Sequence, residues 1–524
     1  MPSRKYAEPS WMNRQIYLID TNVIIGLEDN KTVQPVFAAF IQLATKNKVG
    51  VFIHAAAKDD IARDKNIERR NISASKLEKF SYIDKVRGFD ANTLGEEFGQ
   101  IRKPNDVVDV TLLHALYIGA ADFLVTQDRG LHERARRHSS ELGRRVLHIA
   151  DAVDLLQTTF EPKESPVRFV EEIAANTIPL TDKIFDSLRE DYAPFDQWWK
   201  EKCVREHRQC WIVADNNTKS IAGLIVRKDE APNNTDARLP ANKILKICTF
   251  KVRPENRGVK LGELLLKKVF WFAKKNAYDL VYVTTYKTQN SLIDLLEYYG
   301  FQNTAVKEDG ELIYEKLFSQ GKLSRQPGQD LFTTARLNYP RFVTDPSVRA
   351  FGIPIKEGYH DTLYPDLKYH PQGDLFESAG LIGGPQRPGN TIRKVYLCRA
   401  KSKLGEPGSL LFFYKGKSKH DPSQAITTVG IFEEVASASS TKELMTLSGG
   451  RSVYSEKELE SWKASGGNPI KVINYLLVGY IDPPVGLSEL QEIGVFRDHP
   501  PQSIFEIKEN LKKLLLRAKL GFEI

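Results

Sequence analysis

Acidic residues at the ends of apolar runs are the first sign of chemistry in this chain. Asp20 directly follows the run IYLI, and Asp128 comes two residues after the run FLVT. In parallel α/β sheets, binding sites form beyond the carboxyl ends of the strands. Carboxylates gathered there repel one another unless a counter-charge is present, and oxygen-only ligands suit Mg²⁺ or Mn²⁺. Such an ion activates water and supports displacement at phosphate.

Two further carboxylates are expected on helices that follow strands. The segment VFIHAAAKDDI offers Asp59 or Asp60, and NDVVDVTLLHALYIGA offers Asp106 or Asp109. Acids of this kind also serve as helix N-caps or lie on solvated helix faces, which is the main alternative explanation, above all for Asp106. The residue types alone leave both choices open.

The order of these features resembles the PIN-domain family of metal-dependent ribonucleases. The shared features are a strand ending in DTN, a helical acid after a second strand, a DxxLLxA helix and a closing VTxD, spread over Gln15–Gln157. The resemblance implies an α/β/α fold around a parallel sheet, with Thr126 and Asn22 as supporting polar groups. It also implies a catalytic and metal-binding quartet, which would be Asp20, Asp60, Asp109 and Asp128.

Within this resemblance, Asp60 is preferred to Asp59 because the family's acid is usually followed by an aliphatic residue, and Ile61 follows it. The family more often has Glu at this position. Asp106 is the alternative to Asp109. Because all four positions hold acids, we expect an active nuclease, since a PIN domain used only for binding is expected to lose at least one.

A second candidate site is a turn in the middle of the chain. The strand-like run ILKICTFKV is followed by RPENRGVK and then by the amphipathic run LGELLLKKVFWFAKKN. The start of a helix presents free backbone N–H groups and the positive end of its dipole, so it accepts anions. Gly258 and Gly262 let the backbone approach a ligand closely. An ordinary strand–helix turn is the alternative.

This turn resembles the acyl-CoA pyrophosphate loop of GNAT acetyltransferases, R/Q-x-x-G-x-G/A. Arg257 is the first position and Gly262 the sixth, but Lys260 replaces the central glycine, where it would either crowd the pyrophosphate or pair with it. The resemblance implies an α+β GNAT fold and acetyl-CoA as the ligand. The implied binding residues are Val252, Arg257, Gly258, Lys260, Leu261, Gly262 and Asn290.

A second GNAT motif follows in NSLIDLLEYYGF, which has Asn290 and the Gly300–Phe301 pair in place. The position of the family's usual general-acid tyrosine falls on Leu296, so no catalytic residue is assigned in this region. Enzymes of this kind act largely by positioning the amine and stabilising the leaving thiolate, so activity is still expected. The resemblance spans about Val167–Phe318, and the acyl acceptor is not predicted.

The last third of the chain has β-rich runs between Pro- and Gly-bearing segments. The segment SLLFFYKGKSKHDPSQAITTVGIFEEV resembles the PUA-like superfamily, which includes ASCH and EVE domains, through Phe413–Tyr414 and Val429–Gly430. The match covers about Lys394–Ile507. It implies a small β-barrel that binds RNA or modified bases.

The elements that position these sites require several domains. The chain has 524 residues, and single cores stop growing near roughly 250–300 residues. Alternating strands and helices predict α/β folds in the first two regions, so the expected fold class is multidomain α/β plus a β-barrel. The expected division is a PIN-like domain at 14–160, a GNAT-like domain at 165–318, a linker at 319–340 and a PUA-like domain at 341–515.

Composition restricts the setting of the protein. Lys and Arg number 75 against 67 Asp and Glu, a formal charge of +8 that permits a polyanionic partner. The four cysteines form no CxxC pair, which favours a reduced compartment. We find no signal peptide and no apolar run of about 20 residues, so we expect a cytoplasmic protein without membrane contact.

The leading hypothesis is a metal-dependent endoribonuclease coupled to an acetyl-CoA-binding GNAT domain and a PUA-like RNA-binding domain. The expected partners are RNA, either tRNA or mRNA, with an antitoxin or a second copy also open, and toxin, phage-defence or RNA-processing roles fit this reading by fold-level analogy. One alternative is an N-acetyltransferase acting on RNA or protein, whose other domains only bind. Another is a non-catalytic RNA-binding adaptor.

Overall fold

The computed structural model divides the chain into two compact units. One comprises Met1–Lys163 with Ala438–Ile470, and the other Glu164–Ser437 with Lys471–Ile524. The structure describes residues 15–25, 35–63, 65–83, 90–160, 168–191, 194–215, 220–253, 260–318, 322–367, 391–419, 421–449, 451–452, 454, 456–496, 499–500 and 502–521.

The first unit is built on a five-stranded parallel sheet with the order β3-β2-β1-β4-β5. The central strand β1 pairs Tyr17 with Val51 on one side and with Phe123 on the other. Its strands are β1 (Ile16–Ile19), β2 (Gly50–His54), β3 (Ser81–Ile83), β4 (Phe123–Val125) and β5 (Val146–Leu147).

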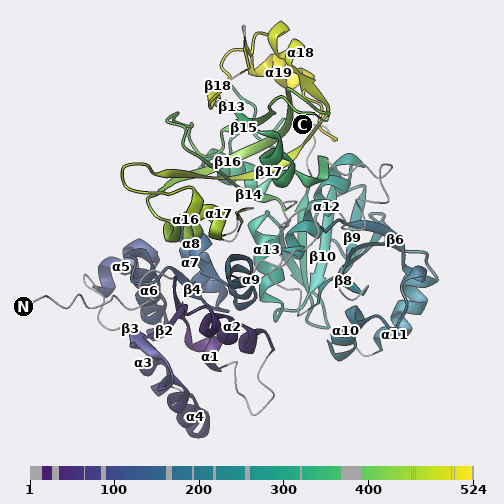
Figure 1. Ribbon diagram of the computed structural model, residues 1–524. Coiled ribbons are helices and arrows are strands. Elements are labelled where there is room, and N and C mark those ends of the chain that lie inside the picture. Colours follow the sequence, from purple (N-terminus) through teal and green to yellow (C-terminus); the bar gives the residue numbers. More distant parts are fainter. Residues whose placement is uncertain are drawn as a thin grey trace, which may run out of the picture. The chain divides into compact units, whose positions relative to one another are not determined.

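Helices cover both faces of this sheet, because its strands are apolar on both sides. One buried cluster packs α2, α3 and α9 on it, and a second packs α5 to α8, which gives three layers (Figure 1). The helices are α1 (Thr21–Ile25), α2 (Pro35–Lys46), α3 (Ala56–Ala62), α4 (Ile67–Leu77), α5 (Ala91–Phe98), α6 (Pro104–Tyr117), α7 (Arg129–His138), α8 (Ser140–Arg145) and α9 (Ile149–Phe160).

An insertion from the last third of the chain belongs to this first unit. It contains α16 (Thr441–Ser448) and α17 (Glu456–Ser461). The Lys442 ammonium lies 3.0 Å from the Asp122 carboxylate, which also accepts the backbone N–H of Ile16 at 2.7 Å. The insertion therefore pairs with the sheet of the first unit at the start of β1 and β4.

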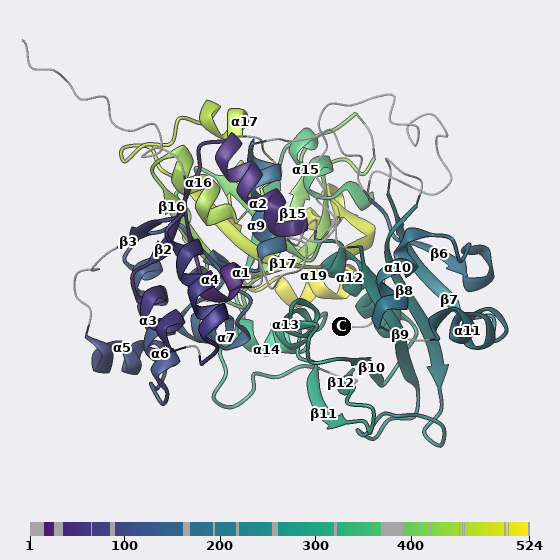
Figure 2. The ribbon, with the colours of Figure 1, turned by 90° about the horizontal axis from the view of Figure 1, so that it is seen from below.

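The second unit contains a seven-stranded sheet with the order β11-β12-β10-β9-β8-β7-β6. Only β9 and β10 run parallel among its strand pairs in the described residues (Figure 2). Its strands are β6 (Glu171–Ala174), β7 (Gln209–Ala214), β8 (Ile221–Glu230), β9 (Ile244–Val252), β10 (Leu280–Thr285), β11 (Gln302–Val306) and β12 (Leu312–Leu317).

Two long helices pack on one face of this sheet and short ones on the other. The helices α12 (Leu261–Lys275) and α13 (Asn290–Tyr298) share a buried cluster with alternate residues of β7 to β10. The opposite face carries a second cluster with the short elements η1 (Ala175–Thr177), η2 (Lys183–Phe185), α10 (Asp186–Asp191), α11 (Phe195–Trp198) and η3 (Trp199–Val204). This α+β arrangement is the one expected for the middle region.

A third sheet has six strands in the order β14-β17-β16-β15-β13-β18. Among the described strands this series ends at β14 and β18, and a closed barrel stays a prediction. The strands are β13 (Ala350–Ile355), β14 (Arg393–Cys398), β15 (Leu410–Lys415), β16 (Ala425–Ala438), β17 (Ile470–Gly486) and β18 (Phe505–Glu506). Its helices are α15 (Glu357–Leu363), η5 (Pro365–Leu367), α18 (Leu487–Glu492) and α19 (Leu511–Arg517).

The middle region and the third sheet share one hydrophobic core. It joins α12 and α13 to β15, β16 and β17 through helix α14 (Leu331–Leu337), which lies in the segment expected to be a linker. The expected boundaries thus differ from the compact units in two ways. Residues 165–318 fall in the same compact unit as residues 341–437 and 471–515, and Ala438–Ile470 groups with the first unit.

Two further observations concern the whole chain. Within the described residues, every helix is too short or too polar to cross a bilayer. All four cysteines are free thiols.

Candidate functional site

The parallel strands β9 and β10 part before they end. Their pairing runs from Ile244–Leu280 to Ile247–Val283 and then stops. Beyond that point β9 continues to Val252 paired only with β8, and β10 continues to Thr285 paired only with β12, among the described pairs. The sheet is therefore open between the carboxyl ends of its two parallel strands, where sites form in α/β sheets.

A β-bulge accompanies this opening. The β8–β9 register passes from Val226–Thr249 to Arg227–Ile247, so Cys248 is the extra residue on β9. A bulge bends its strand and increases its twist. It lies one residue beyond the last β9–β10 pair, which gives a local reason for the parting of the strands.

Eight residues separate the end of β9 from the start of helix α12. Its N-cap is Lys260, whose φ of 55° and ψ of 19° are left-handed, the conformation in which glycine is least strained. This explains why a glycine is usual at the fourth position of the resembled motif. Leu261 is buried, and Arg257 and Gly258 lie outside the described residues.

Two glycines fix how α12, α13 and α14 pack. A Cβ on Gly262 would lie 3.3 Å from the Leu295 side chain of α13, so that side chain would have to shift by a few tenths of an ångström. Gly300 has φ +86°, and its Cβ would lie 2.0 Å from the Leu337 carbonyl oxygen. Asn290 is the first residue of α13. Leu296 is fully buried in the core, and its hydrocarbon side chain has no proton to donate.

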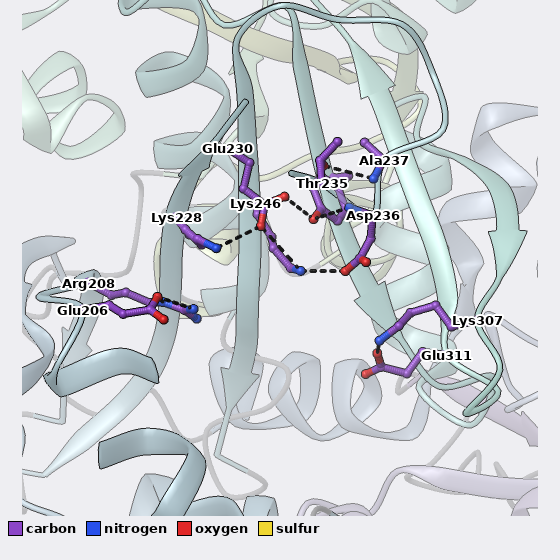
Figure 3. A network of polar contacts seen from close by, with 11 residues as sticks. Glu206, Arg208, Lys228, Glu230, Thr235, Asp236, Ala237, Lys246, Lys307 and Glu311 are labelled. Atoms are coloured by element: carbon purple, nitrogen blue, oxygen red, sulfur yellow. Dashed lines mark hydrogen bonds and ion pairs between the residues drawn. The ribbon is translucent and has the colours of Figure 1, made fainter. Parts of the chain in front are cut away.

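A polar network lies on the sheet face opposite α12. Tyr282 donates to Glu230 at 2.6 Å. The Lys246 ammonium lies 2.8 Å from Asp236 and 3.7 Å from Glu230 (Figure 3). Burial, and then the bond to Glu230, raises the pKa of Tyr282 above its ordinary value. Burial alone would lower the pKa of Lys246, but Asp236 raises it. The network therefore holds a charged lysine and a neutral tyrosine.

The insert between β8 and β9 packs over this network. The backbone N–H groups of Arg238 and Leu239 donate to Glu315 at 2.6 and 3.2 Å. Ala237, Leu239 and Ala241 pack on a small apolar cluster of β9, β10 and β12. These contacts hold the insert on the sheet.

In the first unit, Asp20 is the centre of a second polar network. Thr126 donates to its carboxylate at 2.7 Å and Asn22 donates to it at 2.7 Å. The Thr126 oxygen in turn accepts from Asn22 at 3.1 Å and from the backbone N–H of Asp128 at 3.0 Å. These bonds tie the end of β1 to the end of β4, as parallel neighbours allow.

Asp60 joins this network through Thr21. The Thr21 hydroxyl lies 2.7 Å from Asp60 Oδ2 and 3.2 Å from Asp20 Oδ1. Asp60 also forms an ion pair with Arg63 at 3.1 Å, whereas Asp59 is exposed. Thr21 was not among the residues singled out from the sequence, although it belongs to the DTN signature.

The two acids of α6 have different environments. Asp106 accepts the backbone N–H groups of Arg102 and Lys103 at 2.6 and 2.9 Å and pairs with Arg134 at 3.1 Å, so it caps the helix. Burial, and then the charges of Asp128 and Asp20, raises the pKa of Asp109 to about 7. Asp109 is therefore the α6 acid whose pKa is raised by the charges of Asp128 and Asp20.

Negative charge is concentrated among the carboxylates of Asp20, Asp109 and Asp128. Burial raises the pKa of Asp20 to about 6 despite its hydrogen bonds, and Asp128 adds to the rise. Asp128 also caps α7 by accepting from the Leu131 N–H at 3.2 Å. Among the described residues, no three of these four aspartates bring one oxygen each within 4.8 Å of one another. The donor set suits a hard cation, but the side chains must move together to hold one.

Comparison with known proteins identifies the middle region. Residues 174–301 match the sequence model of the Acetyltransferase (GNAT) family. This match runs from the last residue of β6 to just beyond α13 and includes the parted strands and the start of α12. The chain therefore contains a GNAT acetyltransferase domain. No curated protein matches the chain.

Solved structures with similarity to parts of the chain include three of low identity. ASCH from Zymomonas mobilis is 15% identical, with 33% of this chain and 96% of that chain covered and a TM-score of 0.24. A putative GNAT-family acetyltransferase from Desulfovibrio desulfuricans is 17% identical, with 28% of this chain and 98% of that chain covered and a TM-score of 0.22. A GNAT-family acetyltransferase from Elizabethkingia anophelis with acetyl-CoA bound is 17% identical, with 29% of this chain and 99% of that chain covered and a TM-score of 0.21. Because these TM-scores are below 0.5, the GNAT assignment rests on the family match.

Proposed function

We propose that the second unit is an N-acetyltransferase that takes acetyl-CoA. The observation that carries the proposal is the GNAT family match over residues 174–301. The parting of β9 and β10 just before α12 supports it, because an extended ligand with a phosphate-bearing end fits a strand edge that leads to a helix N-terminus. RNA and protein amines are both candidate acceptors.

The residues of the chain act here mainly by binding and positioning. Backbone N–H groups in the first turn of α12 and the Lys260 ammonium would hold the phosphates. The β9 edge from Thr249 to Val252 would orient the rest of the ligand. When bound, acetyl-CoA supplies a thioester whose carbonyl carbon an amine attacks, so that a C–N bond forms, a C–S bond breaks and the amine loses a proton.

Acetyl-CoA titrated calorimetrically into the full chain tests this proposal. We expect one site, with binding weakened in Lys260→Glu because the substitution reverses charge at the proposed phosphate site. Lys322→Glu is the control, because Lys322 is an exposed lysine that lies outside the motif. Absence of binding by the unmodified protein would refute the proposal. Equal effects of the two substitutions would refute the phosphate site.

A second candidate function is metal-dependent RNA cleavage by the first unit. Its support is the network that joins Asp20 to Thr126, Asn22 and Thr21, with Asp109 in the same field of negative charge. Mg²⁺ or Mn²⁺ would be held by Asp20, Asp60, Asp109 and Asp128, and would supply an activated water for attack on phosphate. Thr126 and Asn22 would keep the Asp20 carboxylate aimed at the ion.

Incubation of labelled RNA with the full chain and Mn²⁺ tests this second function. Cleavage should be lost in Asp20→Asn and Asp60→Asn and retained in Asp59→Asn, a neighbouring acid that is exposed. Intact RNA under every metal, with unchanged acetyl-CoA binding in the same variants, would leave the acetyltransferase as the only enzyme.

For the third sheet we propose a PUA-like fold with an RNA-binding role. Lys417 and Lys419 are exposed beside the turn between β15 and β16, where they can meet phosphate. Lys415 does not share this role, because it is buried and pairs with Asp361 at 3.0 Å. RNA affinity that falls steeply with salt, and less steeply in Lys417→Gln/Lys419→Gln, supports the proposal, and an unchanged salt slope opposes it.

A further inference from the structure

The first turn of α12 contains a carboxylate that opposes its proposed ligand. Glu263 is the third residue of the helix and is 3% exposed. A helix start favours anions, and a carboxylate there competes with any phosphate for the same N–H groups and the same potential. In a buried setting, like charges repel more strongly than in water. A site for a polyanionic ligand needs this charge to be cancelled.

The cancelling charge comes from the third sheet. Arg393, the first residue of β14, donates its backbone N–H to Glu263 Oε1 at 2.6 Å and its Nε to Oε2 at 2.7 Å. Burial alone would lower the pKa of Arg393, but the Glu263 carboxylate raises it above its ordinary value. The pair is therefore a charged, doubly hydrogen-bonded contact, which is the strong form of such an interaction.

Further basic residues surround this pair. Lys267 of α12 lies 2.7 Å from Asp366 of η5, which also accepts from Tyr480 at 2.8 Å. Lys394, next to Arg393, is buried and donates to the Leu363 carbonyl at 2.7 Å. It lies in the fields of Lys267 and Lys260 as well as those of Asp366 and Glu263. Near the start of α12, the cations Arg393, Lys260 and Lys267 thus outnumber the anions Glu263 and Asp366.

We propose that Arg393 is a positioning residue of the acetyl-CoA site, through which the third sheet supplies the counter-charge that lets the first turn of α12 accept the ligand's phosphates. This inference rests on the proposed acetyltransferase function. It assigns the third sheet a part in that function which does not involve RNA. It also gives a reason why the two regions share a core.

The two partners of this pair have opposite expected effects on binding. Removing the charge of Arg393 leaves Glu263 facing the phosphates, so acetyl-CoA affinity falls. Removing the charge of Glu263 leaves Arg393 beside the phosphates, so affinity is kept or rises. A pair that merely holds the fold together would weaken binding from either side.

The experiment measures acetyl-CoA affinity by calorimetry on the full chain for Arg393→Gln, Glu263→Gln and the double variant. We expect acetyl-CoA affinity to fall about tenfold in Arg393→Gln and to be unchanged in Glu263→Gln. In the double variant it should return to within about threefold of the affinity of the unmodified protein. Arg349→Gln, which removes an exposed two-bond contact with Glu506 in the same sheet, is the control and should have no effect.

Each other outcome is decisive. Unchanged affinity in Arg393→Gln, or an equal loss in Glu263→Gln, overturns the inference while the acetyltransferase proposal stands. Failure of the unmodified protein to bind acetyl-CoA is instead a failure of the proposed function. If Arg393→Gln does not fold, Glu263→Gln and the charge-retaining Arg393→Lys provide the test, because both must bind at least nearly as well as the unmodified protein.

Discussion

The two candidate sites are built from different materials. The acidic cluster of the first unit is made of side chains, with Asp20 held by Thr126 and Asn22. The site proposed in the GNAT domain is made largely of backbone, namely the parted strands and the start of α12. A site made of side chains should lose its function when one functional group is substituted. A site made of backbone should lose ligand binding only when the packing or the electrostatic potential around it changes.

The largest expected effect is on stability, at Gly300, where the neighbouring backbone leaves no space for a side chain. Gly300→Ala places a Cβ 2.0 Å from the Leu337 carbonyl oxygen at a φ of +86°, so we expect a loss of about 3 kcal/mol or more in the free energy of unfolding. Gly310→Ala is the control, because its φ is +87° but nothing lies within 4 Å of its Cβ. It should cost only about 1 kcal/mol. Urea denaturation measures both, and equal losses would show that the α13–α14 contact is unimportant.

The next effect tests the side-chain site. At a Mn²⁺ concentration one hundred times the dissociation constant, the first unit should gain about 2.7 kcal/mol of stability. Asp20→Asn should abolish this gain, because it removes a charged oxygen ligand, and Asp59→Asn should not. Thermal unfolding with and without Mn²⁺ measures the difference. A gain that survives in Asp20→Asn would place the ion elsewhere.

A third prediction concerns pH and the cations around α12. Burial, and then the charge of Lys267, lowers the pKa of Lys394 from 10.5 to about 7. Between these values the unfolded chain binds a proton that the folded chain does not, so this residue makes stability rise with pH. In Lys394→Met the rise should be smaller by up to about 1.4 kcal/mol per pH unit. Urea denaturation at several pH values across this window tests it, and parallel slopes would contradict a buried neutral lysine.

The smallest effect distinguishes strain from ligand binding at Lys260. Lys260→Gly relieves a left-handed conformation, so the free energy of unfolding should rise by about 0.5–1 kcal/mol. Acetyl-CoA affinity should nevertheless fall, because the ammonium is lost. Higher affinity together with higher stability would mean that the side chain crowds the ligand instead.

Local patterns predicted the elements well. The run ILKICTFKV is β9 and the run beginning at Leu261 is α12, because alternating and helical apolar spacings are local properties of the sequence. The DTN and VTxD signatures likewise pointed to Asp20 and Thr126, which lie at neighbouring strand ends. Their role in metal binding stays a prediction.

Contacts between distant segments were not predictable. Arg393 and Glu263 are 130 positions apart, and each looks like an ordinary surface charge in its own segment. The helix-capping role of Asp106 is decided by the backbone at Arg102 and Lys103, which a pattern of residue types does not show. The grouping of Ala438–Ile470 with the first unit also depends on tertiary contacts.

A crystal structure of the full chain with acetyl-CoA tests the central claim most directly. The account predicts the pyrophosphate at the first turn of α12 and the pantetheine along the edge of β9 where it parts from β10. A ligand bound elsewhere, or β9 and β10 closed against each other with the ligand absent at saturating concentration, would contradict it.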